Sequence, residues 1–77
     1  MRPRRRTPTL GAELRRIRER RGLTVRELAI RAGLSAEAVS AIERGVRYPS
    51  LHSLECLAQA LEIRVVIGPS ETILEAD

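Results

Sequence analysis

The sequence predicts a mainly α-helical domain that ends in a β-strand. In four segments between Leu10 and Leu61, apolar residues recur at the three- and four-residue spacing of amphipathic helices. Each of these segments follows a serine or a threonine, which are residues that cap helix N-termini. By contrast, the segment that ends the domain contains three consecutive β-branched residues, Val65, Val66 and Ile67, which are typical of a strand.

Length and composition indicate one small domain that gains from a partner chain. A chain of 77 residues buries only about 60% of its unfolded surface, so its stability alone is marginal. Because it has no Trp or Phe, its core must consist of Leu, Ile, Val and Ala. It contains neither an apolar run long enough for a membrane span nor a secretory signal, so we expect a cytoplasmic protein without a membrane partner.

The charge of the chain is unevenly distributed. The formal net charge is +4, every basic residue is arginine, and the last sixteen residues are acidic on balance. Arginine favours bidentate phosphate contacts, although a genome-wide codon bias would give the same composition. Residues 1–8 are predicted to form a flexible basic arm that contacts DNA phosphates or enters the minor groove, or alternatively a solubilising tail. The arm carries Arg2, Arg4, Arg5 and Arg6.

The first helix is predicted over residues 10–21. Its inward face consists of Leu10, Leu14 and Ile17, at helical spacing among charged residues. Thr9 is the expected N-cap, and Gly22 ends the helix.

The next two helices are predicted to form a helix-turn-helix. Thr24 and Glu27 have the spacing of a capping box at the start of the first motif helix. Gly33 can adopt the left-handed conformation that ends a helix, and Ser35 can cap the second one. That second helix ends at Gly45. Two short helices joined by such a tight turn define the motif.

The fourth helix and the strand complete the predicted domain. Ser50 caps a helix with a continuous inward stripe, which comprises Leu51, Leu54, Leu57, Ala58 and Leu61. We expect Cys56 to be a small buried thiol, and since His52 and Cys56 provide too few ligands, no metal site is predicted. The strand lacks an evident partner in its own chain, so we expect it to pair with another chain.

Five sequence blocks resemble the Xre-like helix-turn-helix family of phage repressors and Cro. They are L-R-x-I-R-x-x-R-G-L-T, E-L-A, A-G-L-S, V-S-x-I-E-R-G and Y-P-S-L-x-x-L, within residues 10–61. The resemblance implies a four-helix, lambda-repressor-like domain over residues 9–61. Residues 62–67 resemble the end of HipB-type antitoxin repressors, which implies a dimerisation strand in an intermolecular antiparallel ribbon. Residues 62–77 are thus expected to comprise this strand and an acidic tail that is frayed or binds a partner. A fifth, dimerising helix is the alternative, and the β-branched run and Pro69 disfavour it.

The resemblance also implies roles for individual residues. The recognition helix is Ser35–Arg44, with base contacts at Ala36, Glu37, Ser40 and Ala41, although Glu37 is equally consistent with a solvated acid. Phosphate contacts are implied at Thr24, Val25, Arg26, Ser35, Arg44, Arg47 and Tyr48. Family members often have a phosphate-binding glutamine where Val25 stands, and Arg26 can compensate. A structural ion pair is implied between Arg18 and Glu43. The implied dimer interface comprises Ile63, Arg64, Val65, Val66 and Ile67.

The predicted function is that of a dimeric, double-stranded-DNA-binding transcriptional regulator, a repressor that recognises a palindromic operator. The four residues implied to contact bases include no Arg, Lys, Asn or Gln, so we expect few specific hydrogen bonds to bases. The alternative is an antitoxin that neutralises a toxin protein and regulates its own operon. One His, one Cys and no clustered acids provide no nucleophile and base for an enzyme, and no cofactor is expected.

Overall fold

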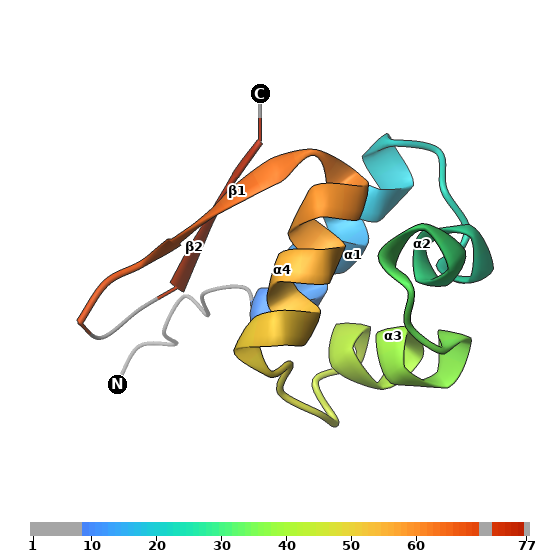
Figure 1. The fold of residues 1–77 in the computed structure, drawn as a ribbon, viewed down its shortest axis with the longest axis horizontal. Helices are drawn as coiled ribbons and strands as arrows, with labels where there is room; N and C mark the ends of the chain where they lie inside the picture. Colours follow the sequence, from blue (N-terminus) through green and yellow to red (C-terminus); the bar gives the residue numbers. More distant parts are fainter. Residues whose placement is uncertain (1–8, 70–71, 77) are drawn as a thin grey trace, which may run out of the picture.

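The chain folds into four helices and a two-stranded antiparallel sheet in a computed structural model that describes residues 9–69 and 72–76 (Figure 1). The fold class is therefore as predicted. The elements follow one another in the order α1 (Leu10–Arg20), α2 (Val25–Ala32), α3 (Ala36–Glu43), α4 (Leu51–Leu61), β1 (Ile63–Ile67) and β2 (Thr72–Ala76).

The helices begin at the four predicted caps. The side-chain oxygens of Thr9, Thr24, Ser35 and Ser50 each accept a hydrogen bond from the backbone N–H three residues later, over 3.0–3.1 Å. Such a bond satisfies one of the N–H groups that a helix start leaves without a partner. The helix boundaries agree with the predicted ones to within one or two residues, because these signals are local in the sequence.

The tight turn between α2 and α3 depends on Gly33. Its φ of 73° lies in the left-handed region, which is strained for residues with a Cβ. The Leu34 N–H donates to the Ala29 carbonyl over 2.9 Å and so closes the end of α2. The turn sets the angle at which α3 leaves α2.

The core consists of aliphatic side chains from all four helices, as predicted. Its largest fully buried members are Leu14, Leu28, Leu57, Leu61 and Val39. In this arrangement α2 packs against both α3 and α4, and α1 packs against α3. Cys56 is only half-buried at the edge of the core, with its Sγ 3.6 Å from Nε2 of His52.

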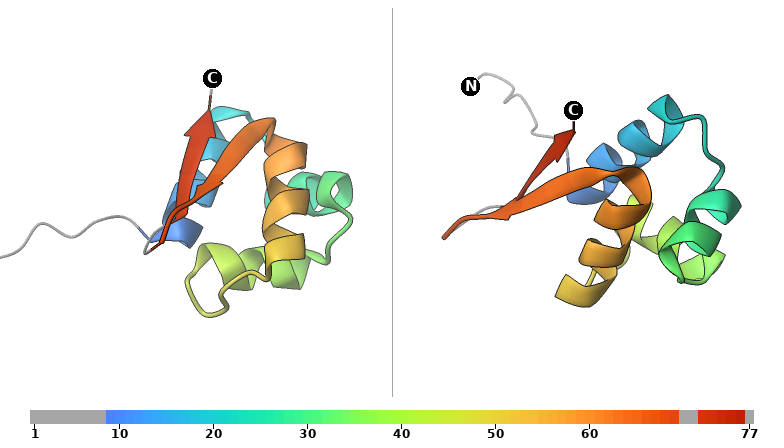
Figure 2. Two further views of the ribbon diagram at one scale, coloured as in Figure 1. Left: turned by 60° about the vertical axis from the view of Figure 1, so that its left-hand side comes forward. Right: turned by 45° about the horizontal axis from the view of Figure 1, so that its top comes forward.

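The prediction that β1 has no partner in its own chain is wrong. β1 pairs with β2 of the same chain, in a register that places Val65 opposite Leu74 (Figure 2). Gly68 and Pro69 allow the chain to reverse, and the β-branched Thr72 and Ile73 begin the second strand. The edge of β1 assigned to an intermolecular ribbon is thus occupied by β2, and most of the tail expected to fray is a strand.

The hairpin lies beside the helical core and extends beyond it. Val65 and Leu74 pack against the core, whereas Val66 and Ile73 on the other face of the sheet are exposed. On that outer face, Arg64 donates to the Glu75 carboxylate over 2.8 Å. β1 packs against α4 and β2 against α1, so the hairpin lies on the opposite side of α4 from α2 (Figures 1 and 2).

Candidate nucleic-acid interface

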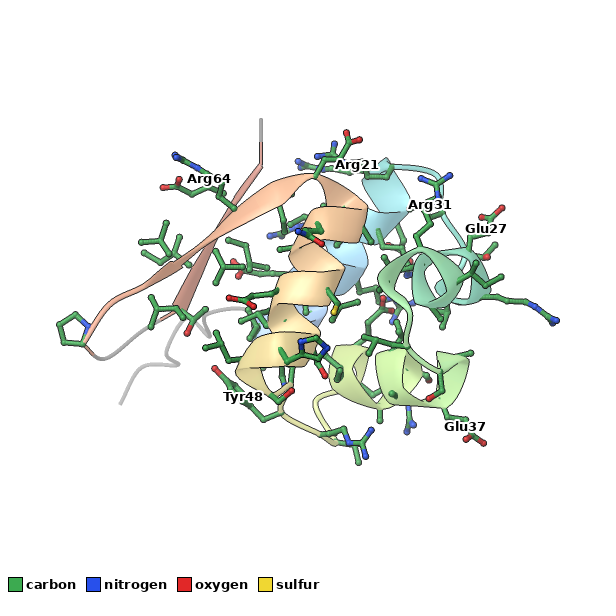
Figure 3. The ribbon with its side chains drawn as sticks, in the orientation of Figure 1. Arg21, Glu27, Arg31, Glu37, Tyr48 and Arg64 are labelled. Carbon is green, nitrogen blue, oxygen red and sulfur yellow. The ribbon has the colours of Figure 1, made fainter. Side chains whose placement is uncertain are left out.

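Helix α3 has a buried inner face and an open outer face. Val39 and Ile42 are buried against the other helices. On the opposite side, Ala36 and Glu37 are exposed, and Ser40 and Ala41 are half-exposed. Figure 3 shows the Glu37 side chain pointing away from the rest of the molecule. The four residues predicted to contact bases therefore lie together on one accessible surface, which we call the recognition face.

A buried ion pair fixes the C-terminal end of α3. Arg18 Nε and Nη2 donate to the two carboxylate oxygens of Glu43 over 2.7 and 3.0 Å, and Arg18 Nη1 donates to the Leu23 carbonyl over 2.7 Å. The hydrogen bond that Arg18 donates to Glu43, aided by the charge of the carboxylate, raises the pKa of Arg18 above its ordinary value. The predicted pair is confirmed, and it joins α3 to α1 and to the segment that precedes α2.

The chain after α3 folds back towards that helix and exposes two arginines. The N–H groups of Val46 and Arg47 both donate to the Ala41 carbonyl, over 3.0 and 3.2 Å. Arg47 and Tyr48 are exposed, while Pro49 is buried. Residues 44–48 thus form a short, hydrogen-bonded loop beside the recognition face, which we call the arginine loop.

Arg44 is directed along α3 by a hydrogen bond that was not predicted. Its Nε donates to the Ser40 Oγ over 3.3 Å, one helical turn back. The four-residue spacing of Ser40 and Arg44 could have indicated this contact. As a result, the positively charged Arg44 guanidinium lies next to Ser40, one of the predicted base-contacting residues.

The N-terminus of α2 is less open to an anion than the sequence suggested. The Glu27 carboxylate accepts the Thr24 N–H over 2.9 Å, in the predicted capping box. That hydrogen bond lowers the pKa of Glu27, so a negative charge already occupies this helix end. Val25 is half-buried and packs against the core, whereas Arg26 is exposed. Of the three predicted phosphate contacts Thr24, Val25 and Arg26, Thr24 and Arg26 are thus exposed and Val25 is not.

The other predicted site residues lie apart from this surface. Arg2, Arg4, Arg5 and Arg6 fall outside the described residues. The predicted dimer residues of β1 lie across α4 from α2 and α3 (Figure 1). The described residues include no helix with the length and apolar composition of a membrane-spanning segment. Nor does the described part of the chain gather three or more metal-ligating side chains.

Comparisons with known proteins identify the family of this fold. The model of the helix-turn-helix domain family matches residues 9–65, so the chain belongs to that family. It is 38% identical over 65 residues to an HTH-type transcriptional regulator of Sinorhizobium fredii, covering 84% of this chain and 33% of the relative. It is 45% identical over 56 residues to the transcriptional repressor RghR of Bacillus subtilis, covering 71% of this chain and 42% of RghR. The chain thus spans 33% of the length of the first relative and 42% of that of RghR.

Two solved structures share the fold. The restriction-modification controller protein C.AhdI of Aeromonas hydrophila superposes with a TM-score of 0.69 at 41% identity, over 70% of this chain and 82% of that one. The biofilm regulator SinR, in its complex with DNA, gives a TM-score of 0.67 at 31% identity, over 70% of this chain and 87% of that one.

Proposed function

We propose that the chain is a DNA-binding transcriptional regulator that places α3 in the major groove of double-stranded DNA. One observation carries the proposal: α3 is held rigidly from behind by buried Val39, Ile42 and the Arg18–Glu43 pair, while its outer face is open. An α-helix fits the major groove, and it reads bases only if its backbone is fixed relative to the rest of the domain. The DNA complex of SinR supports the same use of this fold.

Few side chains on the recognition face can make specific contacts with bases. Glu37 can accept a hydrogen bond from a cytosine amino group, and the methyl groups of Ala36 and Ala41 can contact thymine. Ser40 already accepts a hydrogen bond from Arg44, so these two side chains act as a unit at the groove. We infer that DNA shape and the spacing of two half-sites provide much of the specificity.

Phosphate contacts provide most of the affinity in this proposal. The exposed Arg44 and Arg47 flank the recognition face, and the Tyr48 hydroxyl is accessible beside them. Arg26, the Thr24 hydroxyl and Ser35, which are exposed at the starts of α2 and α3, provide further contacts in this proposal. The basic arm, with Arg2, Arg4, Arg5 and Arg6, adds further contacts. Such contacts release counterions, so the affinity should fall steeply as salt is added.

Repression of transcription from a palindromic site is the regulatory role we propose. RghR is a repressor, and a symmetric pair of these domains would read two half-sites about one helical turn apart. The regulators and repressors described above give no specific support to the antitoxin alternative.

Selection of bound sequences from random double-stranded DNA tests the proposal. We expect a short palindromic motif for the wild-type chain. A Glu37→Ala variant should select the same half-site spacing with altered bases at one position of each half-site, because only one base contact is removed. An Arg31→Ala variant is the control, since Arg31 is exposed at the end of α2 beyond the recognition face, and its motif should be unchanged. The absence of any enriched motif for the wild-type chain would overturn the proposal.

A further inference from the structure

The middle of the recognition face is formed by Glu37 and Ala41. Both lie on the side of α3 opposite the buried Val39 and Ile42. Residues four apart on a helix are neighbours, with about 5–6 Å between their Cβ atoms. Since helical side chains lean towards the helix N-terminus, the Ala41 methyl group leans towards the turn that carries Glu37. A carboxylate and a methyl group thus lie next to each other on the accessible side of α3.

The Glu37 carboxylate is available to accept hydrogen bonds from a ligand. Among the residues that the structure describes, none of the ion pairs involves Glu37. Arg44, seven residues later and so on the same side of α3, donates instead to the Ser40 Oγ over 3.3 Å. The Glu37 side chain points away from the rest of the molecule (Figure 3). Its carboxylate is therefore an acceptor directed at whatever covers the recognition face.

Cytosine is the base whose major-groove edge suits a carboxylate, because its N4 amino group is a donor. The next atom on that edge is C5, which carries a hydrogen in cytosine and a methyl group in 5-methylcytosine. Thymine has the same methyl group, but its O4 is an acceptor and repels a carboxylate. Among these three bases, only 5-methylcytosine offers a donor to Glu37 and a methyl group to Ala41 at the same time.

We propose that the recognition face prefers 5-methylcytosine to cytosine, with Glu37 accepting from N4 and the Ala41 methyl group packing against the C5 methyl group. This inference rests on the proposed function, because it requires α3 to lie in the major groove. The small side chain of Ala41 leaves room for the added methyl group, and contact between two apolar groups removes both from water. The ligand is then double-stranded DNA that is methylated at this cytosine, and methylation strengthens binding.

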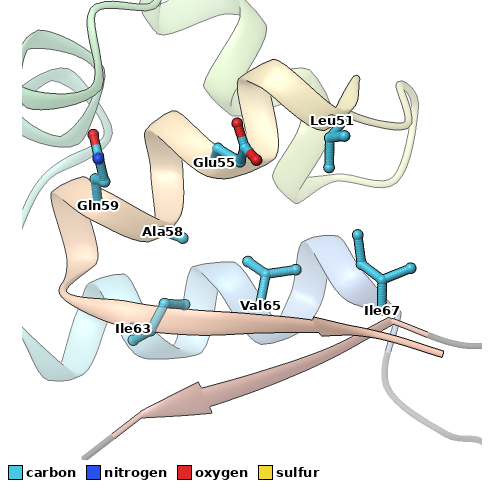
Figure 4. A pocket seen from close by; sticks show the side chains of 7 residues that line it. All are labelled: Leu51, Glu55, Ala58, Gln59, Ile63, Val65 and Ile67. Carbon is cyan, nitrogen blue, oxygen red and sulfur yellow. The ribbon is translucent and has the colours of Figure 1, made fainter.

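The hollow between α4 and β1 offers DNA no alternative surface. It has a volume of about 430 Å³, and none of its lining residues is basic. Figure 4 shows the Glu55 carboxylate on α4 and the aliphatic side chains of Val65 and Ile67 on β1. Such a surface repels a polyanion, whereas the exposed Arg44 and Arg47 beside α3 attract one. The arginines therefore direct a duplex to the side of the molecule that carries the recognition face.

The affinity for three versions of one duplex tests the proposal. The duplex carries the motif that the wild-type chain selects, and the modified base is the cytosine whose preference the Glu37→Ala variant loses. A 5-methylcytosine in one half-site should raise the affinity about fourfold, the factor expected for burying one methyl-sized group. N4-methylcytosine adds the same carbon but replaces the major-groove N–H, so it should lower the affinity about fivefold or more. An unchanged or lower affinity for the 5-methylcytosine duplex would overturn the proposal.

An Ala41→Gly variant tests the protein side of the same contact. The ratio of its affinities for the methylated and unmethylated duplexes should fall from about four to about one. A ratio measured in one protein cancels any loss of folded chain that glycine causes in a helix. The matched control is Ala38→Gly, since Ala38 lines a hollow beside Ser53 on another side of α3, and its ratio should stay near that of the wild type. A wild-type ratio in the Ala41→Gly variant would contradict the assignment of the methyl contact.

The two proposals can fail separately. If the wild-type chain selects no motif at all, the proposed function fails. If it selects a motif without cytosine at the position that depends on Glu37, or binds methylated and unmethylated duplexes equally, the chain still reads DNA and only the preference for 5-methylcytosine fails.

Discussion

Arg18 is the residue that most strongly couples recognition to stability. It makes three hydrogen bonds in a buried position, two of them to the carboxylate at the end of α3. A buried charge that loses its partner costs far more free energy than an exposed one, because neither water nor a counter-charge replaces the lost contact. The same pair that stabilises the domain therefore also holds the recognition helix.

Replacing Arg18 by Met should lower the free energy of unfolding by about 3–5 kcal/mol, because Glu43 is left buried without a partner. Adding Glu43→Leu should restore much of that loss, since the double variant has no unpaired buried charge. Urea unfolding of the four chains of this cycle measures both effects. An equal or larger loss in the double variant would show that the lost packing, and not the unpaired charge of Glu43, causes most of the loss of stability.

Glu27 gives the domain a pH dependence whose sign follows from its cap. The Thr24 N–H lowers the pKa of Glu27 below its ordinary value of 4.5. A carboxylate whose pKa is lower in the folded state than in the unfolded state stabilises the fold at pH values above its unfolded pKa. This stabilisation is lost as the pH falls through the folded-state pKa. The melting temperature of the wild type should thus fall more steeply below pH 4.5 than that of a Glu27→Gln variant. A Glu55→Gln control should behave like the wild type, and parallel profiles for wild type and Glu27→Gln would refute the assignment.

At the scale of the elements, the contact between α1 and α3 depends on a glycine. Gly11 is buried, and a Cβ at this position would overlap the carbonyl oxygen of Ile42. That atom belongs to the backbone of α3, so it cannot move aside as a flexible side chain could. α1 and α3 therefore pack at a distance that only glycine permits here.

A Gly11→Ala variant should be less stable, although alanine is the better helix former by about 1 kcal/mol. Overpacking typically costs about 1–3 kcal/mol, and the displacement of a backbone carbonyl belongs at the upper end of that range. An Ala12→Ser change in the same turn is the control, because Ala12 is exposed and should alter stability by less than about 0.5 kcal/mol. Thermal unfolding of the Gly11→Ala and Ala12→Ser variants measures both changes in stability. A Gly11→Ala variant more stable than the wild type would show that α3 can shift freely.

The sequence predicted those elements that local signals define. Thr9, Thr24, Ser35 and Ser50 act on backbone N–H groups only three residues away, so the four helices could be predicted from short windows. The hairpin could not be predicted from short windows of sequence, because Val65 and Leu74 meet only after the chain has reversed. An acidic tail with two apolar residues is also compatible with fraying.

The four residues of the recognition face were assigned through the family resemblance, and helical periodicity accounts for why they share one side of α3. The Arg18–Glu43 pair, 25 residues apart in the sequence, was expected only through the family resemblance. The hydrogen bond between Arg44 and Ser40 and the half-buried position of Val25 required side-chain coordinates.

At the scale of the whole molecule, the recognition face and the arginine loop form one accessible side. The hairpin lies across α4 from α2 and α3 (Figure 1). This arrangement leaves the recognition face open to a polyanion. It assigns the affinity for DNA to particular arginines rather than to the net charge of +4.

The salt dependence of DNA binding tests that assignment most directly. Replacing both Arg44 and Arg47 by Ala should make the slope of log affinity against log salt shallower by about 2, since each lost phosphate contact contributes about 0.9. Replacing the exposed Arg16 and Arg20 of α1 by Ala removes the same charge outside the recognition face and the arginine loop, and should leave the slope nearly unchanged. Equal changes in the two double variants would contradict the account, because they would mean that DNA responds to the overall charge and not to the surface around α3.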